Sequence, residues 1–373
     1  MKLDSTNVQQ TNQWRRHTPP RKEGVGIAKE GAMKRAKTII GIDVGSESVS
    51  TAVMHSLEQK EKQEQQFSNN NEGFEELHQW LQSNKVKADE SVVVMEATGV
   101  YGESLCYYLC SRRYAVAVEP PLKVKRAFQQ SAHKNDTVDA RQIAEYGHRF
   151  YDELQYWSPP DVVLEQVREL LSAREQFTTQ KIANTNALKS LQRKIITSVT
   201  AMEAYEQAIE RLKQNIDSID KEIKRLTKED DSFHSMITRL TSTPGIGMLL
   251  AANLIVMTQG FTRTTSSKEL ASFAGVSPIE HISGTSVYRK ARSRQFGPHR
   301  LRKLLYLSAM SVATHNAEFR KYYLRKVAEG KPKRLVLNNV ANKLLKIVCA
   351  LVKTEREYIP NYRSVNPSLL TLS

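Results

Sequence analysis

Four acidic residues have the types and positions of ligands for divalent cations. Asp43 ends an apolar stretch that predicts a strand, and Glu96 ends a valine-rich one. Asp136 and Asp139 are three residues apart, so a helix that begins here places both carboxylates on one face. Oxygen ligands suit Mg²⁺ or Mn²⁺, and two such ions activate the attacking oxygen and stabilise the leaving oxygen in phosphodiester cleavage. A bound cation would also relieve the repulsion among the four carboxylates.

Each acid alone has a simpler interpretation. An Asp after a strand is often a turn former, and Asp136 is a suitable N-cap for the helix that follows it. The segment from Gly41 to Gly45 also resembles the phosphate loop of actin-like ATPases, but the second Asp motif and the adenosine-binding Gly-Gly turn are not found in the sequence. The four acids together, in the element order described next, favour a metal site.

The elements that must position these acids follow a recognisable order. Apolar and β-branched runs predict three consecutive antiparallel strands, then helix, strand, helix and strand. The expected strands are 38–45, 49–54, 64–68, 91–96 and 114–118, with helices around 74–81 and 101–113. This order is typical of an α/β ribonuclease-H-like fold.

The middle of the chain is helical. Leucine and isoleucine recur at spacings of 4, 3, 4 and 3 between residues 212 and 226, which is a heptad seam. A shorter seam of the same kind runs through Leu188, Leu191, Ile195 and Val199. Two long helices joined near 197–204 form either an antiparallel hairpin or a dimeric coiled coil, and the sequence leaves both open.

The charge is uneven along the 373 residues. The formal net charge is +15, but residues 38–260 carry −6, whereas residues 1–37 carry +6 and residues 261–373 carry +15. Such an excess predicts a polyanion-binding C-terminal region, and the polar N-terminal stretch predicts a disordered basic tail.

Two classes of protein are disfavoured by the sequence. The longest mostly apolar run, 248–257, is short for a bilayer span, and the N-terminus has no signal-peptide core, so we expect no membrane partner. Three cysteines provide neither a disulfide framework nor a Cys-x-x-Cys pair. These features favour a cytoplasmic protein.

The C-terminal third contains two further candidate sites. Gly245 and Gly247 precede a predicted helix, where free backbone N–H groups can bind a phosphate as in helix-hairpin-helix modules. Ser283 precedes a glycine in a basic segment, and a serine hydroxyl there can attack a phosphodiester. Nearby cations would bind nucleic acid: Arg289, Lys290, Arg292, Arg294, Arg300, Arg302 and Lys303.

The whole pattern resembles the transposases of the insertion sequence 110 and 1111 family, also called DEDD transposases or bridge-RNA-guided recombinases. The N-terminal half is similar in its Gly-Ile-Asp strand and in residues 95–99 (Met-Glu-Ala-Thr-Gly) and 134–140 (Lys-Asn-Asp-Thr-Val-Asp-Ala). The C-terminal half is similar in residues 243–247 (Thr-Pro-Gly-Ile-Gly), 283–286 (Ser-Gly-Thr-Ser), 330–332 (Gly-Lys-Pro) and 342–345 (Asn-Lys-Leu-Leu). Asn135, where the family usually has Thr, and Gly297-Pro298-His299-Arg300, where it usually has Gly-Asn, depart from the pattern.

The resemblance implies a RuvC-like domain whose four acids fall on Asp43, Glu96, Asp136 and Asp139, and a nucleophile at Ser283, with Ser286 next in line. It further implies a dimer or tetramer in which the acids of one protomer work with the serine of another. A noncoding bridge RNA would pair with donor and target DNA. The implied location is the cytoplasm of a prokaryote, on the nucleoid.

These features divide the chain into four parts. We expect a basic tail (1–37), a RuvC-like catalytic domain (38–155), a helical coiled-coil or dimerisation segment (156–235) and a mostly α-helical C-terminal transposase domain (236–373). The leading hypothesis is an RNA-guided DNA transposase or recombinase. The alternatives are a RuvC-like structure-specific endonuclease that uses metal-activated water, and a nucleic-acid-binding protein with an inactive catalytic domain.

Overall fold

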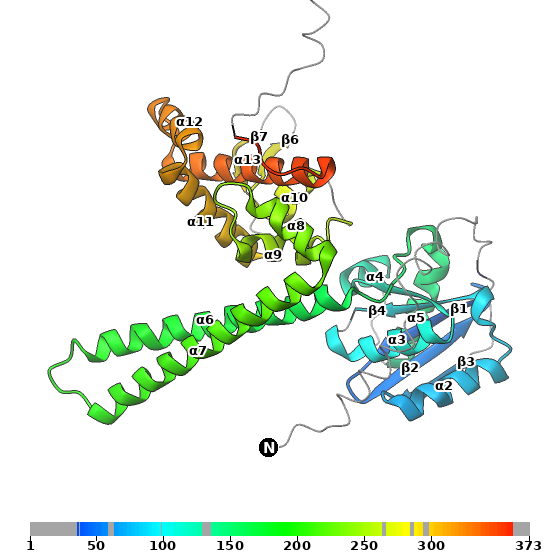
Figure 1. Cartoon of the computed structure of the whole chain (residues 1–373). Coiled ribbons are helices and arrows are strands. Elements are labelled where there is room, and N and C mark those ends of the chain that lie inside the picture. The colour runs from blue at the N-terminus through cyan, green and yellow to red at the C-terminus, as the bar shows by residue number, and fades with distance from the viewer. Residues whose placement is uncertain are drawn as a thin grey trace, which may run out of the picture. The chain divides into compact units, whose positions relative to one another are not determined.

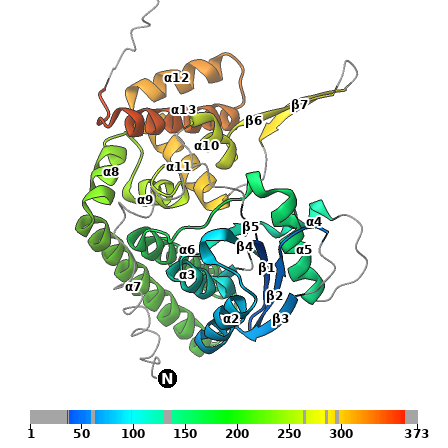
Figure 2. The same cartoon turned by 90° about the vertical axis from the view of Figure 1, so that its right-hand side faces the viewer.

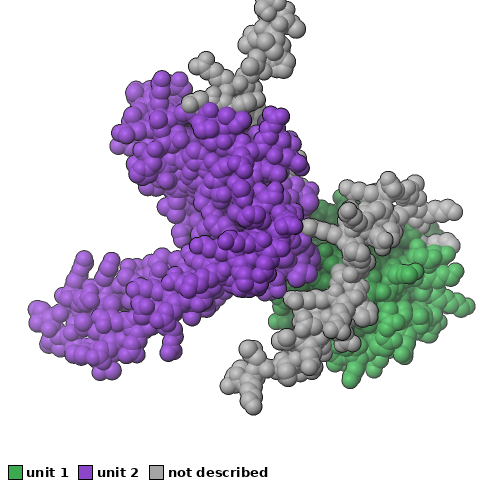
Figure 3. Space-filling model, viewed as in Figure 1, with its two compact units in different colours: residues 1–159 green, residues 160–373 purple. Residues whose placement is uncertain are grey.

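A computed structural model describes most of the chain in two compact units, residues 1–159 and residues 160–373 (Figure 3). The residues described are 36, 38–58, 63–97, 99–128, 136–262, 266–283, 287–293 and 298–360, and the side chains of 136–138, 278–283 and 287–293 are not described. The expected basic tail therefore lies outside the described residues, except for Ala36.

The first unit is built on a five-stranded mixed sheet with the order β3-β2-β1-β4-β5 (Figures 1 and 2). β1 pairs antiparallel with β2 and parallel with β4, and β5 continues the sheet parallel to β4. This order confirms the predicted ribonuclease-H-like topology. The strands are β1 (Thr38–Val44), β2 (Ser48–Met54), β3 (Gln63–Ser68), β4 (Ser91–Glu96) and β5 (Ala115–Glu119).

Helices cover both faces of this sheet because β1 and β4 are apolar on both sides. One face packs against α2 and α3, and the other against α4 and α5 (Figure 2). The bounds are α2 (Asn71–Ser83), α3 (Glu103–Ser111), α4 (Pro121–Ala127) and α5 (Asp136–Arg149). Asn70 caps α2 by accepting a hydrogen bond from the backbone N–H of Gly73.

α5 lies unusually close to β1 because a glycine on each element removes the side chain that would separate them. A Cβ on Gly41 would overlap the backbone oxygen of Ala140 and the backbone nitrogen of Ala144. A Cβ on Gly147, near the other end of α5, would lie 2.7 Å from the Cγ2 methyl of Ile39. The helix axis is therefore fixed on the sheet at two points, and α5 runs antiparallel to β1.

The second unit begins with an antiparallel pair of long helices, α6 (Val162–Leu191) and α7 (Val199–Glu229), drawn in green in Figure 1. Of the two alternatives that the sequence left open, the structure has the antiparallel hairpin, in which the two helices pair within one chain. Ile216, Ile223 and Leu226 of the predicted heptad seam are buried. A bidentate ion pair also joins the helices, from Arg174 Nε and Nη2 to the two carboxylate oxygens of Asp220, at 2.6 and 3.0 Å.

The shorter predicted seam is partly wrong. α6 ends at Leu191 and the connection spans 192–198, so the turn comes earlier than the expected 197–204. Ile195 and Val199 therefore lie at the tip of the hairpin, where they are exposed. Heptad spacing alone did not reveal the turn, because the spacing continues across it.

The rest of the second unit is a helical core with one two-stranded ribbon (Figure 1). α13 is long and apolar enough to cross a membrane by length and composition. It is a core helix here, because residues such as Val340, Leu344 and Val348 are fully buried in the unit. The elements are α8 (Asp231–Thr241), α9 (Met248–Met257), α10 (Ser267–Phe273), β6 (Pro278–Ser283), β7 (Val287–Ser293), α11 (His299–His315), α12 (Ala317–Ala328) and α13 (Lys333–Thr354).

The close crossing of α5 over β1 predicts a graded effect of two glycine substitutions. Gly41→Ala is expected to destabilise the chain by about 2–4 kcal/mol, because the new methyl meets backbone atoms that cannot move aside without displacing α5. Gly147→Ala is expected to cost less, since its methyl meets side-chain methyls that can shift and alanine favours the helix. Urea denaturation of the wild type and the two variants measures their free energies of unfolding. Equal stability of Gly41→Ala and the wild type would contradict the close contact.

Candidate active site

Strand register brings Asp43 and Glu96 to the same edge and the same face of the sheet. Ile42 pairs with Met95 in the parallel β1–β4 ladder, so Asp43 and Glu96 follow one step later. Side chains alternate along a strand, and Ile42 and Met95 both belong to the core cluster on the α2–α3 side. Asp43 and Glu96 therefore face α5.

α5 supplies the third carboxylate. Ala140 and Ala144 rest on Gly41, so Asp139, which precedes Ala140, lies toward the end of β1 that carries Asp43. Asp136 is the first residue of α5, one turn before Asp139. Its side chain lies outside the described part. The positive end of the helix dipole is thus at the carboxylates, which it stabilises.

Electrostatics link three of the four acids. The pKa of the Glu96 carboxyl is raised, first by burial and then by the negative charge of Asp43, with a smaller contribution from Asp139. Lys125 on α4 opposes the shift by favouring the ionised form. The structure thus brings Asp43, Glu96 and Asp139 within electrostatic reach of one another, at one edge of the sheet.

The donor set fits a hard divalent cation, because every member is a carboxylate and the cluster is crowded with like charge. Among the described side chains, no group of three His, Cys, Asp or Glu residues is arranged to hold a metal ion. Asp136, the fourth acid, is not among these side chains.

Another carboxyl, that of Glu119, belongs to the strand next to Glu96. Glu119 ends β5 and pairs with Glu96 in the parallel ladder, but its side chain is fully buried. Its Oε1 accepts a hydrogen bond from the backbone N–H of Gln155 at 2.9 Å, and its Oε2 lies 3.2 Å from Nζ of Lys123. Glu119 therefore fixes the segment that leaves the first unit, and its charge is balanced by Lys123.

Ser283 belongs to the second unit, at the end of β6. It pairs with Val287 across the β6–β7 ribbon, and Arg289 and Arg292 follow on β7. Lys290 also lies on β7, and the side chains of these residues are not described. Arg294 and the alternative nucleophile Ser286 lie outside the described residues.

The base of this ribbon is fixed by two asparagines of α13. Asn338 Nδ2 and Asn342 Nδ2 each donate a hydrogen bond of 2.7 Å to the backbone oxygen of Val276, two residues before β6. Gly275, at φ +65°, makes the turn that presents this carbonyl. The side chains that fix the start of the ribbon therefore come from a helix far along the chain.

The glycine loop before α9 has two different roles. Gly245 has φ +78°, and a Cβ there would overlap Cγ1 of Val312 on α11, so this glycine is required by packing. Gly247 is the N-cap of α9 and is exposed, with open space around its Cα. Of the two predicted phosphate-binding glycines, Gly247 is the one with room for a ligand.

Two family models match the chain. A model described as Transposase, for the DEDD transposases of the IS110 type, matches residues 40–197, which include the three coupled acids and Asp136. A second, described as Transposase IS116/IS110/IS902 family, matches residues 237–324, which include the glycine loop and the ribbon. The chain belongs to the IS110/IS116/IS902 family of transposases. It is an enzyme that cleaves and transfers DNA strands, with a DEDD nuclease domain of a kind that uses divalent metal.

The chain is also similar to curated proteins and to a solved structure. The transposase is 28% identical over 328 residues to the pilin gene-inverting protein of Moraxella lacunata. The aligned residues cover 87% of this chain and 98% of the Moraxella protein. It is 32% identical over 113 residues to an uncharacterized 43.6 kDa protein of the insertion element IS110 in Streptomyces coelicolor. This alignment covers 30% of the transposase and 28% of the Streptomyces protein. Among solved structures, Thermus thermophilus RuvC bound to a Holliday junction substrate matches 32% of this chain and 99% of its own, at 13% identity and a TM-score of 0.26.

The remaining predicted basic residues lie at the start of α11 in the transposase. Arg300 is half-buried, and its Nε and Nη2 have no hydrogen-bond partner among the described residues. Burial lowers its pKa, and the positive charge of Arg174 lowers it further, against the opposing charge of Glu175. A buried guanidinium with unpartnered donors is costly, and a phosphate would supply the missing acceptor. Arg302 and Lys303 follow on the same helix.

The sequence pointed to the acids but missed three residues around the two sites. Lys125 had a usable signal, because the run Lys123-Val124-Lys125-Arg126 follows β5 and so begins at the edge where Glu96 ends β4. The sequence around Glu119 and Asn338 contains no comparable signal. Their roles depend on a register and a long-range contact that one sequence does not reveal.

The charge crowding at Glu96 predicts that neutralising it stabilises the metal-free protein. A raised pKa in the folded state means that folding disfavours the ionised carboxyl, so stability falls as the pH rises through that pKa. In EDTA at neutral pH, Glu96→Gln should therefore melt at a higher temperature than the wild type. Added Mg²⁺ should raise the melting temperature of the wild type more than that of the variant.

Glu76 provides the control for this measurement. It is exposed on α2, on the opposite side of the sheet, and Glu76→Gln should change neither the melting temperature nor its response to Mg²⁺. A lower melting temperature for Glu96→Gln in EDTA would contradict the crowding of the three carboxylates.

Proposed function

We propose that this transposase recombines DNA through Ser283 as nucleophile, assisted by Mg²⁺ or Mn²⁺ at Asp43, Glu96, Asp136 and Asp139, with a noncoding bridge RNA that selects donor and target DNA. The observation that carries the proposal is the electrostatic coupling of Asp43, Glu96 and Asp139 in a chain that belongs to a DEDD transposase family. Like charges brought together at one sheet edge repel one another, and a bound cation would relieve that repulsion.

The acids serve to hold cations against the DNA phosphate. A bound divalent metal would polarise the phosphate and stabilise the leaving oxygen. Asp43 and Glu96 come from neighbouring rigid strands and Asp139 from a helix fixed on them, so their separation is set by the core. Lys125 opposes the raised pKa of Glu96 and so favours the ionised carboxyl, which is the form that can act as a ligand.

Ser283 carries the strand-transfer chemistry in this proposal. Its Oγ attacks phosphorus as the hydroxyl proton leaves, and the bond from phosphorus to a deoxyribose oxygen breaks. That oxygen takes up a proton and becomes a free hydroxyl. In the second step a deoxyribose hydroxyl of the other duplex attacks the phosphoserine and releases the serine. The number of phosphodiester bonds is conserved, so no external energy source is needed.

The partners follow from the same assignment. In related transposases the acids of one protomer are thought to work with the serine of another, and we propose a homodimer or tetramer here. Gly247, Arg300, Arg302, Lys303 and the arginines of β7 would bind nucleic acid, supported by the net charge of +15 in residues 261–373. Acting on DNA, the assembly would work in the cytoplasm, on the nucleoid.

The serine mechanism predicts a covalent protein–DNA intermediate that depends on both sites. With a supercoiled plasmid that carries the element ends, the wild type should form an adduct that survives a denaturing gel. Ser283→Ala should abolish both the adduct and the recombination. Asp43→Asn should do the same, because the phosphate loses a metal ligand, with a loss of at least about 100-fold.

Ser286→Ala is the matched control, because it removes a hydroxyl three residues away in the same segment. It should retain the adduct and the recombination, and all variants should show a cooperative melting transition. Strand cleavage by Ser283→Ala without an adduct would favour the alternative, a RuvC-like endonuclease that uses metal-activated water. Full recombination by Ser283→Ala would refute the nucleophile.

The RNA component has its own test. The protein is expressed together with its native flanking DNA and purified, and the bound RNA is sequenced. One discrete RNA transcribed from the flank is expected, with loops complementary to the donor and target. A random mixture of RNA from a folded protein would contradict guided recombination and leave a transposase that selects its sites without RNA.

A further inference from the structure

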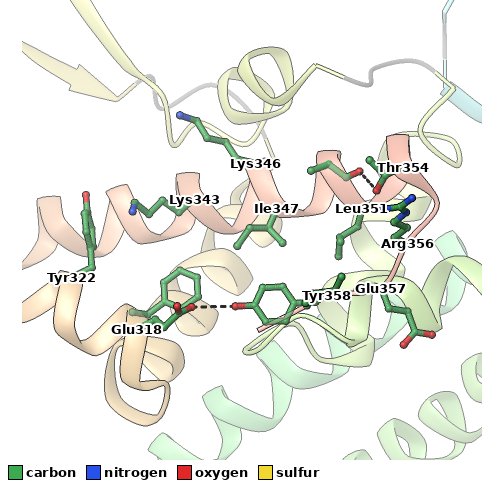
Figure 4. Close-up of a pocket in the computed structure, with 13 residues that line it drawn as sticks. Glu318, Tyr322, Lys343, Lys346, Ile347, Leu351, Thr354, Arg356, Glu357 and Tyr358 are labelled. Carbon is green, nitrogen blue, oxygen red and sulfur yellow. Dashed lines mark hydrogen bonds between the residues drawn. The ribbon is translucent and has the colours of Figure 1, made fainter. Parts of the chain in front are cut away.

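The second unit contains a cavity that none of the chemistry above uses. It has a volume of about 690 Å³ and lies between α12, α13 and residues 356–359 (Figure 4). Its floor is apolar, formed by Phe319, Ile347 and Leu351. The volume is within the range of pockets that bind small organic ligands.

Two tyrosines border this cavity. Tyr322 stands on α12, and Tyr358 reaches across from the segment after α13 (Figure 4). The backbone N–H of Tyr358 donates to Oγ of Ser242 at 2.8 Å, and its hydroxyl donates to Oε2 of Glu318 at 3.4 Å. These contacts hold the ring of Tyr358 beside the apolar floor, whereas the ring of Tyr322 is covered in part by Lys343 and Arg325. Flat apolar faces of this kind stack on nucleobases.

The cavity also has a small excess of positive charge, because Lys343, Lys346 and Arg356 line it together with Glu318 and Glu357. Nζ of Lys343 lies 3.9 Å from the centre of the Tyr322 ring. The pKa of Lys343 is lowered by burial and then by the positive charges of Arg325, Lys346 and Lys326, so the cations here crowd one another. Lys346 and Arg356 line the rim and are exposed. An anion at this rim would relieve the crowding.

The two helices around the cavity extend this charge. Together α12 and α13 carry nine Lys and Arg residues, whereas Glu318 is their one acidic residue. Glu318 is hydrogen-bonded to Tyr358, and its negative charge offsets part of the crowding at Lys343. Charge complementarity therefore points to a polyanion, and an apolar floor between two aromatic rings points to one with flat, unstacked bases.

We propose that this cavity binds an unstacked nucleotide of a single-stranded nucleic acid, with the base between Tyr322 and Tyr358 and its phosphates at Lys343, Lys346 and Arg356. The proposal rests on the proposed function insofar as that function places nucleic acid on this protein. A docked protein helix fits less well, because it would cover the apolar floor and leave the lysines without counter-charge.

The test compares the affinity of charge-matched variants of the full chain. The probe is a fluorescein-labelled single strand of about 20 nucleotides, as oligouridylate or oligothymidylate. Lys343→Ala with Lys346→Ala should weaken binding roughly tenfold and reduce the slope of log affinity against log salt by about 1.4, since two phosphate contacts are lost. Lys321→Ala with Lys333→Ala removes the same charge from the same helices outside the cavity and should change both values far less.

The aromatic part is tested separately. Tyr322→Ala should weaken binding about fivefold or more, and Tyr322→Phe should leave it unchanged, because the ring and not the hydroxyl stacks. A strand that contains 4-thiouridine should cross-link under ultraviolet light to a peptide that includes Tyr322 or Tyr358. Melting curves show whether each variant is folded.

The proposal would be overturned if the two double-lysine variants lost the same affinity. It would also be overturned if the strand cross-linked only to peptides without Tyr322 or Tyr358. Tighter binding of oligouridylate supports an RNA nucleotide, and tighter binding of oligothymidylate a DNA one. The outcome is separate from that of the recombination assay, because a chain that recombines DNA but binds through other surfaces fails this test alone. A wild type that binds neither strand overturns this proposal alone, because the adduct and recombination assays test the proposed function with its own DNA.

Discussion

The contact between Gly41 and the backbone of α5 is the constraint on which the acidic site depends. A helix that packs on a sheet through side chains stands well away from the strands, but here the backbone of α5 meets β1 directly. Asp139, just before the contacting Ala140, contributes to the raised pKa of Glu96. The hydrophobic core beneath, with Ile39, Val94 and Ile143 fully buried, supplies the free energy that holds the carboxylates together against their repulsion.

The two predicted sites have opposite physical characters. The acidic site is built on strands and a helix that are fixed by a core, and its geometry is set before any substrate arrives. Ser283 instead lies on a two-stranded ribbon, whose base is fixed at Val276 by hydrogen bonds from α13. An acidic site fixed by a core and the proposed nucleophile on a separate ribbon would suit the proposed reaction, in which a serine must meet a DNA strand held elsewhere.

Much of the first unit was predictable because its signals are local. Valine and isoleucine runs defined β1 and β4, and their ends located Asp43 and Glu96. The α6–α7 turn was misplaced, since heptad spacing continues through Ile195 although that residue is exposed. Glu119 and the asparagines of α13 were not predictable, because a parallel register and a contact more than sixty residues apart in the chain leave no periodic trace. The serine and the metal geometry remain predictions.

Asn342 and Lys343 are consecutive residues of α13 with different tasks. Asn342 holds the carbonyl at the root of the ribbon, and Lys343 lines the cavity beside α12. The same turn of α13 therefore supports the root of the ribbon and forms one wall of the cavity. A substitution in this turn acts on both places at once.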